Sequence, residues 1–129
     1  MSIPAPSQAQ ALLNLISVRP GEQPARHEPD FRPLTTGGRV GVEIHQLYTA
    51  EETGGPAAAI ARYLPGAQAS PHEHTGFELI YVLSGELRTD DGVYGPNSML
   101  VMHPGSVHRP HTADGCTVLV VWERPVRPV

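Results

Sequence analysis

The sequence contains no lysine, and all nine of its basic residues are arginine. The absence of lysine excludes Schiff-base chemistry through a lysine amine. It also excludes a P-loop, whose lysine reaches the phosphates of a nucleotide. Because 13 acidic residues outnumber the nine basic ones, the chain has no basic stripe that could neutralise phosphates. We therefore expect no nucleic-acid partner and no binding to an anionic membrane surface.

Cysteine is also nearly absent, since Cys116 is the single one in the chain. A disulfide within the chain is therefore excluded. Long apolar runs are missing as well: the longest early one, residues 11–18 (ALLNLISV), is short, contains Asn14 and follows no cationic segment. We expect neither a signal peptide nor a membrane-spanning helix, and hence a cytoplasmic protein.

Proline and glycine, by contrast, are abundant, with 14 and 13 residues in a chain of 129. Their frequent turns would interrupt helices of ordinary length, which favours an all-β fold. Short β-prone segments stand between these turns, among them residues 39–48, 77–83 and 116–122. The length fits one hydrophobic core. We predict a single β-sandwich or barrel domain over residues 31–129, preceded by a flexible or extended arm over residues 1–30.

Histidines and a glutamate are closely spaced in the segment PHEHTGFELIYVLSG, residues 71–85. His72 and His74 stand at i and i+2, which places them on one face of a strand, and Glu78 keeps that parity if the strand continues across Gly76. A further ligand would come from a neighbouring strand, where the candidates are His103, His108 and His111. Such imidazoles with one carboxylate suit divalent iron, manganese, zinc, nickel or copper, without selecting among them.

The spacing of this segment resembles the first motif of the cupin superfamily. Five residues separate Gly66 from His72, three separate His74 from Glu78, and six separate Glu78 from Gly85. Each defined position of that motif is matched.

A later segment, NSMLVMHPGSVH, resembles the second cupin motif in part. Gly105 and His108 are in place, whereas Asn97 and His103 stand where the motif has glycine and proline. Asparagine tolerates the left-handed backbone conformation that glycine adopts, so the first difference is mild.

The closer resemblance is to small cupins typified by the cupin domain of ChrR-type anti-sigma factors. It is carried by HEHTG, TDDGVYGP, PGSVH and DGCTVLVVWE and extends over residues 31–123. It implies a cupin β-sandwich barrel, or jelly roll, that holds one divalent metal ion, with iron or zinc favoured over manganese or nickel. The ligands implied are His72, His74, Glu78 and His108.

Strand parity predicts the lining of a pocket beside this site. Counting from Glu78, Ile80 faces inward, while Leu79 and Tyr81 face the other layer. In the adjacent strand Leu100 and Met102 share an inward row, so we expect an apolar pocket. Tyr63 and His111 are further candidates for the pocket. No catalytic residue beyond the metal ligands is assigned.

Two classes of function fit this site. The first is a metalloenzyme acting on a small molecule, because relatives of these small cupins include dioxygenases that cleave β-diketones, some with three-histidine iron sites that lack the glutamate. The second is a metal- or ligand-binding sensor of the ChrR type. Residues 1–30 are too short, and contain no cysteine, for the zinc domain with which ChrR-type proteins hold a sigma factor. An isomerase is a weaker alternative. We also expect a homodimer, because edge strands favour pairing.

Overall fold

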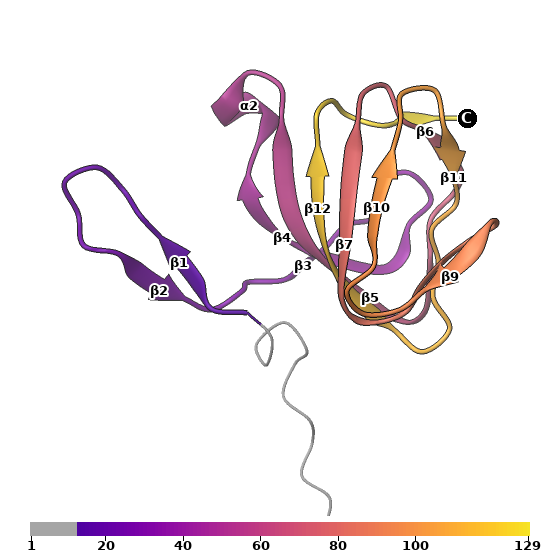
Figure 1. The fold of residues 1–129 in the computed structure, drawn as a ribbon, viewed down its shortest axis with the longest axis horizontal. Helices are drawn as coiled ribbons and strands as arrows, with labels where there is room; N and C mark the ends of the chain where they lie inside the picture. The colour runs from indigo at the N-terminus through magenta and orange to yellow at the C-terminus, as the bar shows by residue number, and fades with distance from the viewer. Residues whose placement is uncertain (1–12) are drawn as a thin grey trace, which may run out of the picture.

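The computed structural model describes residues 13–129, whose regular structure is almost entirely β-strand (Figure 1). In chain order the strands are β1 (Leu15–Ser17), β2 (Ala25–His27), β3 (Arg32–Pro33), β4 (Val40–Tyr48), β5 (Ala57–Gln68), β6 (His72–Glu73), β7 (Glu78–Gly85), β8 (Leu87–Thr89), β9 (Gly92–Tyr94), β10 (Met99–Met102), β11 (Val107–His108), β12 (Cys116–Trp122) and β13 (Arg127–Pro128). A short helix, α2 (Ala50–Thr53), connects β4 to β5. No helix within the described residues has the length and apolar character needed to cross a bilayer.

The strands pair in an antiparallel manner throughout and form two layers. One layer is a six-stranded sheet in the order β10-β7-β12-β5-β4-β3. The other contains the three-stranded sheet β11-β6-β13 and the two-stranded ribbon of β8 and β9. Their inner faces enclose the core, as in a β-sandwich barrel (Figure 1). The prediction of an all-β fold is confirmed.

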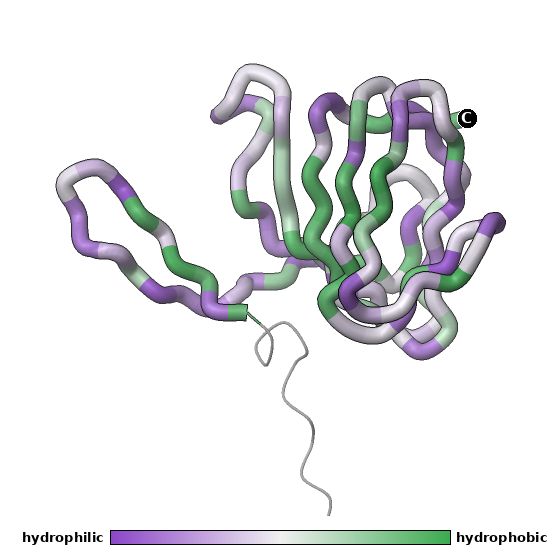
Figure 2. The backbone as a smooth tube through the Cα atoms, viewed as in Figure 1, coloured by the Kyte–Doolittle hydropathy of each residue, from purple (hydrophilic) through white to green (hydrophobic). Residues whose placement is uncertain are grey.

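The core lies between the layers and is built by alternate residues of the central strands. Ile80 and Val82 of β7 lie beside Val120 and Val118 of the neighbouring strand β12. All four are buried together with Leu87. Figure 2 shows that apolar residues are concentrated along these strands. Burying a side chain of this size contributes about 1.5–3 kcal/mol. The predicted inward orientation of Ile80 is therefore correct.

The expected position of the alternate residues of β7 is wrong. Leu79 was expected to pack against the other layer, but its side chain is 39% exposed on the outer face of the six-stranded sheet. The second layer covers only the face that carries Ile80. Leu79 lies opposite Val101 of the edge strand β10, which is also exposed. An apolar patch therefore remains on the outside of this sheet.

The expected N-terminal arm contains a hairpin. Its strands β1 and β2 pair in register, with Leu15 opposite His27, and project from the side of the barrel, where the ring centroid of His27 lies 5.8 Å from that of His45 in β4 (Figure 1). The chain then reaches the sheet at β3, where Arg32 pairs with Ile44 of β4. The part of the expected arm that precedes residue 13 lies outside the described residues. The division into an arm and a domain at residue 30 stays a prediction.

One non-glycine residue has a left-handed backbone in the described part of the chain, and it is Asn97, with φ of 69°. It stands in the turn before β10, at the position where the cupin motif has glycine. Its side-chain oxygen accepts a hydrogen bond from the Tyr81 hydroxyl at 2.6 Å. Asn97 thus adopts the left-handed conformation that glycine favours, which asparagine tolerates as the sequence predicts.

Candidate metal centre

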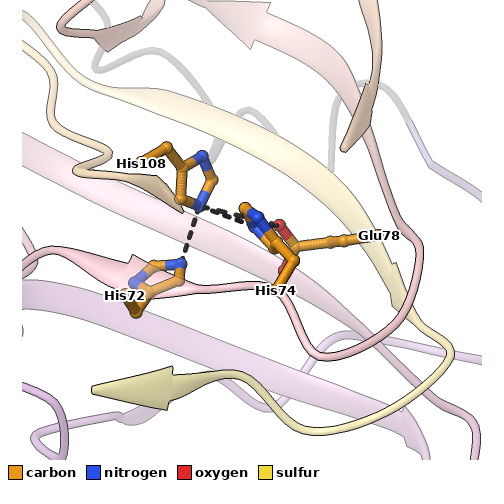
Figure 3. Close-up of side chains that lie close together, drawn as sticks. All are labelled: His72, His74, Glu78 and His108. Atoms are coloured by element: carbon orange, nitrogen blue, oxygen red, sulfur yellow. Dashed lines mark hydrogen bonds and ion pairs between the residues drawn. The ribbon is translucent and has the colours of Figure 1, made fainter. Parts of the chain in front are cut away.

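Four buried side chains converge between the two layers (Figure 3). Each offers one nitrogen or carboxylate oxygen, and these four atoms all lie within 4.8 Å of one another. We call them the histidine–glutamate cluster, made up of His72, His74, Glu78 and His108. The structure thus brings together the four residues that the sequence proposed as ligands.

The reason for their convergence differs from the one that sequence parity gave. His72 lies in β6 of the three-stranded sheet, whereas Glu78 begins β7 of the six-stranded sheet, so no continuous strand crosses Gly76. The chain turns between the layers there and delivers ligands from both. His108 joins them because it is the cross-strand partner of His72 in the β11–β6 pair.

The turn before Glu78 is fixed by Glu123. The Glu123 carboxylate accepts a hydrogen bond from the backbone N–H of Phe77 at 3.1 Å, and the Glu123 N–H donates to the Phe77 carbonyl at 2.9 Å. A side chain at Gly76 would bring its Cβ to 2.8 Å from the Glu123 carboxylate. A larger residue at position 76 would therefore displace the Glu123 carboxylate from its hydrogen bond to Phe77.

Ser106 orients His74, and sequence analysis missed this role. The Nδ1 atom of His74 lies 3.0 Å from the Ser106 carbonyl and 2.9 Å from its hydroxyl oxygen. That hydroxyl in turn donates to the His103 carbonyl at 2.6 Å. The carbonyl can only accept, so Nδ1 of His74 carries the proton and Nε2 points its lone pair into the cluster. The PGSVH motif contains this serine, but the linear sequence does not show which histidine it meets.

A cation fits the arrangement of donor atoms. His72 also directs Nδ1 to a carbonyl, that of Ser70 at 3.3 Å, so its neutral ring presents a second lone pair at Nε2. The Nε2 of His108 lies 2.7 Å from that of His72 and 3.2 Å from that of His74, and the Glu78 oxygen lies 2.8 Å from Nε2 of His74. A single N–H on His108 could serve only one of these acceptors. A divalent metal ion would satisfy all of them together.

The pKa values of the histidines follow from burial and from the Glu78 charge. Burial lowers the pKa of His72 despite the nearby carboxylate. Burial, followed by the charges of the other two cluster histidines, lowers the pKa of His108 to about 3. Burial also acts to lower the pKa of His74, but the hydrogen bond and charge of Glu78 outweigh it and raise that pKa. Of the three cluster histidines, His74 is therefore the one that protonates most readily in the metal-free protein, and metal binding would compete with that proton.

This difference predicts how the stability of the metal-free protein depends on pH. The His108 pKa is about 3 in the folded state and about 6.5 in the unfolded chain. Between these values only the unfolded chain binds this proton, so the free energy of unfolding falls by about 1.4 kcal/mol per pH unit below pH 6.5. His74 has the opposite sign: its stabilisation is complete at low pH and is lost as the pH rises through its raised pKa.

Urea denaturation of the chelator-treated protein between about pH 6.5 and pH 5 measures this slope. His108→Gln should reduce this slope by about 1.4 kcal/mol per pH unit, which is the contribution of one proton. His103→Gln is the matched control, because His103 is exposed and packs its ring on Phe77 at 5.0 Å. Equal slopes in His108→Gln and the unmodified protein would contradict the expectation.

A small cavity of about 30 Å³ adjoins the cluster and is lined by His72, Glu78 and His108. Most of the remaining lining is apolar, from Ile44, Ile80, Val118, Val120 and Trp122 among others. Tyr63 and Ile80, both predicted for the pocket, lie in this lining. Arg39 lies there too and was not foreseen as a site residue, since in the sequence it is only the first residue of the β-prone segment 39–48.

The structure places the other predicted pocket residues elsewhere. Leu100 and Met102 pack against the hydrophobic core and do not line the cavity. They belong to β10, an edge strand separated from the cavity by β7. His111 forms backbone bridges to Gln68 and Arg88, and its Nδ1 atom lies 3.1 Å from the Arg109 carbonyl. His111 thus bridges β5 and β8 and does not line the cavity.

Comparison with known proteins identifies the family. The model of the ChrR cupin-like domain matches residues 16–126. The chain belongs to the ChrR cupin-like family. The predicted resemblance is thereby confirmed. Within this family a curated relative, the anti-sigma-E factor ChrR of Cereibacter sphaeroides, is 33% identical over 105 residues. That alignment covers 79% of this chain and 46% of the relative, so this cupin chain spans about half of the relative's length.

Solved structures similar to this ChrR-like cupin confirm the cupin fold. The polyketide cyclase RemF from Streptomyces resistomycificus superposes with a TM-score of 0.67 at 23% identity, covering 79% of this chain and 80% of that one. An acetylacetone dioxygenase from Acinetobacter johnsonii has a TM-score of 0.70 at 14% identity, covering 88% and 83%. The Rhodobacter sphaeroides complex of SigE with the anti-sigma factor ChrR matches with a TM-score of 0.62 at 24% identity, covering 73% and 49%.

Proposed function

We propose that this cupin is a metal-dependent enzyme that carries out an oxygenase-type reaction on a small organic molecule. The observation that carries the proposal is the buried histidine–glutamate cluster, which opens on a largely apolar cavity. The dioxygenase name of a structural neighbour supports the same class of reaction. Iron or another divalent metal held by the cluster would supply Lewis acidity and, in the case of iron, redox chemistry.

The residues of this chain would prepare the site in three ways. Ser106 holds His74 in the tautomer that presents Nε2. Glu78 supplies one negative charge against the charge of the metal, which favours binding of the ion in a buried site. The apolar walls from Ile80, Val120 and Trp122 exclude water from the space beside the cluster. Together they bind and orient the metal and keep the reacting volume dry.

A non-catalytic sensor is the second candidate. The observation that favours it is the 33% identity to an anti-sigma factor. In that case the cluster would hold its metal tightly, and a ligand in the cavity would alter an interaction with another protein. An isomerase has less support, because the cavity lining is mainly apolar.

Metal content and oxygen uptake separate these candidates. The protein is purified without added metal, its metal is quantified by mass spectrometry, and oxygen consumption is followed with a panel of β-diketones and phenols. We expect bound iron and oxygen uptake with at least one substrate, and loss of uptake in Glu78→Ala. Tightly held zinc without turnover would refute the oxygenase proposal and favour the sensor.

We also propose that the chain forms a cytoplasmic homodimer. Exposed apolar side chains support pairing: Leu79, Met99 and Val101 lie together on the outer face of the six-stranded sheet, and Ile16 and Val18 are exposed at the hairpin. Figure 2 shows apolar stretches on both the hairpin and this side of the barrel. Light scattering after size exclusion should give twice the chain mass, and Val101→Lys should shift it toward the monomer. A strict monomer of the unmodified protein at micromolar concentration would refute the dimer.

A further inference from the structure

Arg39 lies where three hollows of the barrel meet. It lines the inner cavity of about 30 Å³ beside the histidine–glutamate cluster. It also lines two larger outer hollows, one of about 330 Å³ near Gln46 and Trp122 and one of about 410 Å³ near Ser70 and Val129. A molecule that enters from either outer hollow would meet the guanidinium before it reaches the cluster.

Arg39 forms no ion pair with any residue that the structure describes. Six of the other arginines each pair with a carboxylate, namely Arg26, Arg32, Arg62, Arg88, Arg109 and Arg127. The hydrogen bond that Arg39 donates from its side chain goes to the Thr36 carbonyl at 2.9 Å. A half-buried positive charge with only a carbonyl partner still has donors free for an anion.

The loop before β4 holds Arg39 in this position. Gly37 accepts a hydrogen bond from the Ser70 N–H at 3.1 Å, which ties the loop to the residues just before His72. A Cβ at Gly37 would lie 2.7 Å from Nη1 of Arg39, and one at Gly38 would lie 1.9 Å from the Ser70 hydroxyl. Both glycines have left-handed φ angles, of 66° and 65°. A side chain at Gly37 would displace the guanidinium from this position, and one at Gly38 would clash with Ser70.

The charges around the inner cavity favour an anion. A divalent metal beside Glu78 and three neutral histidines would leave one net positive charge, and Arg39 adds a second. Arg39 lines the same small cavity as His72, Glu78 and His108, so its charge adds to that of the cluster. These two positive charges repel each other beside apolar walls, and an anion bound between them would offset that repulsion.

Tyr63 supplies a second hydrogen-bond donor to the same cavity. Burial raises the pKa of its phenol above the ordinary value, which keeps the hydroxyl protonated. Tyr63 lines the same cavity as Arg39, His72 and His108. A protonated hydroxyl in this lining can donate a hydrogen bond to an oxygen atom of a ligand.

We propose that Arg39 binds the carboxylate of a small organic substrate, with the Tyr63 hydroxyl as a second donor. The inner cavity has room for only one or two water-sized groups. The reacting end of the substrate would lie there, and its remaining atoms would extend into an outer hollow. This inference rests on the proposed function, because it assigns the substrate class of the same site.

Calorimetric titration of the zinc-loaded protein tests the inference without relying on activity. The probes are acetate, malonate and benzoate, each compared with its neutral amide, and inorganic phosphate. We expect at least one carboxylate to bind and its amide not to bind. Arg39→Gln should weaken that binding at least about tenfold, and Arg39→Lys should weaken it less.

Arg62→Gln is the matched control and should bind the carboxylate as the unmodified protein does. Arg62 neighbours Tyr63 on β5, but its guanidinium pairs with Glu43 at 2.8 Å and stacks on Phe31. Undiminished binding in Arg39→Gln, equal binding of amides, tighter binding of phosphate or no carboxylate binding would each overturn the inference. Zinc content of every variant is measured alongside. Loss of zinc from the unmodified protein refutes the metal site itself, whereas full zinc without an Arg39 effect refutes only this inference.

Discussion

His74→Ala is expected to weaken metal binding by more than about 100-fold. Replacing a residue that merely orients a ligand costs about 10–100-fold, and His74 offers its Nε2 directly to the cluster. This side chain is 1% exposed and lies within hydrogen-bond distance of both Glu78 and His108. Its removal also leaves the Glu78 carboxylate buried without its closest partner. The measurement is metal stoichiometry and affinity in a competition titration with a chelator.

Two further variants sharpen this result. His103→Ala should retain full metal content, because the exposed His103 ring packs on Phe77 and offers nothing to the cluster. The metal affinity of Ser106→Ala should lie between those of His74→Ala and His103→Ala, with a loss of about 10–100-fold. This substitution removes a hydrogen-bond partner of His74 and leaves the ligand itself. Full metal stoichiometry and unchanged affinity in His74→Ala would disprove the assignment of the site.

Gly85→Ala is expected to lower the free energy of unfolding by about 2–5 kcal/mol. Gly85 ends β7 with φ of 71°, a conformation that costs other residues about 1–2 kcal/mol. A Cβ there would also lie 2.1 Å from the Gly115 carbonyl oxygen and 2.8 Å from Cα of Cys116. Both obstacles are backbone, so β7 and β12 must separate, and such overpacking adds about 1–3 kcal/mol.

Gly66→Ala is the control, since it shares the backbone conformation and lacks the clash. Gly66 has φ of 80° and nothing within 4 Å of a Cβ. Its replacement should cost only about 1–2 kcal/mol. Urea denaturation of both metal-free variants gives the comparison. Equal destabilisation by the two substitutions would show that the close approach of Gly85 to Gly115 is unimportant.

Much of the fold could be predicted because it depends on local chemistry. Frequent proline and glycine limit helices, and β-prone segments between them alternate as strands do, which predicted the inward side of Ile80. Asn97 illustrates the same point, because the tolerance of asparagine for a left-handed backbone is a property of the residue itself. Leu79 could not be placed correctly, since parity separates the two faces of a strand but does not say whether the outer face is covered.

The sequence by itself determined which four residues form the candidate metal centre. Their spacing belongs to a family motif. The four residues do lie together, although the explanation by one continuous strand is wrong. Only the tertiary structure decided how His72 and Glu78 meet, by a turn from one layer to the other. It alone placed Ser106 against His74 and Arg39 at the cavity. Contacts between distant segments depend on strand register and on the crossing between layers, and neither is encoded by the spacing of residues along the chain.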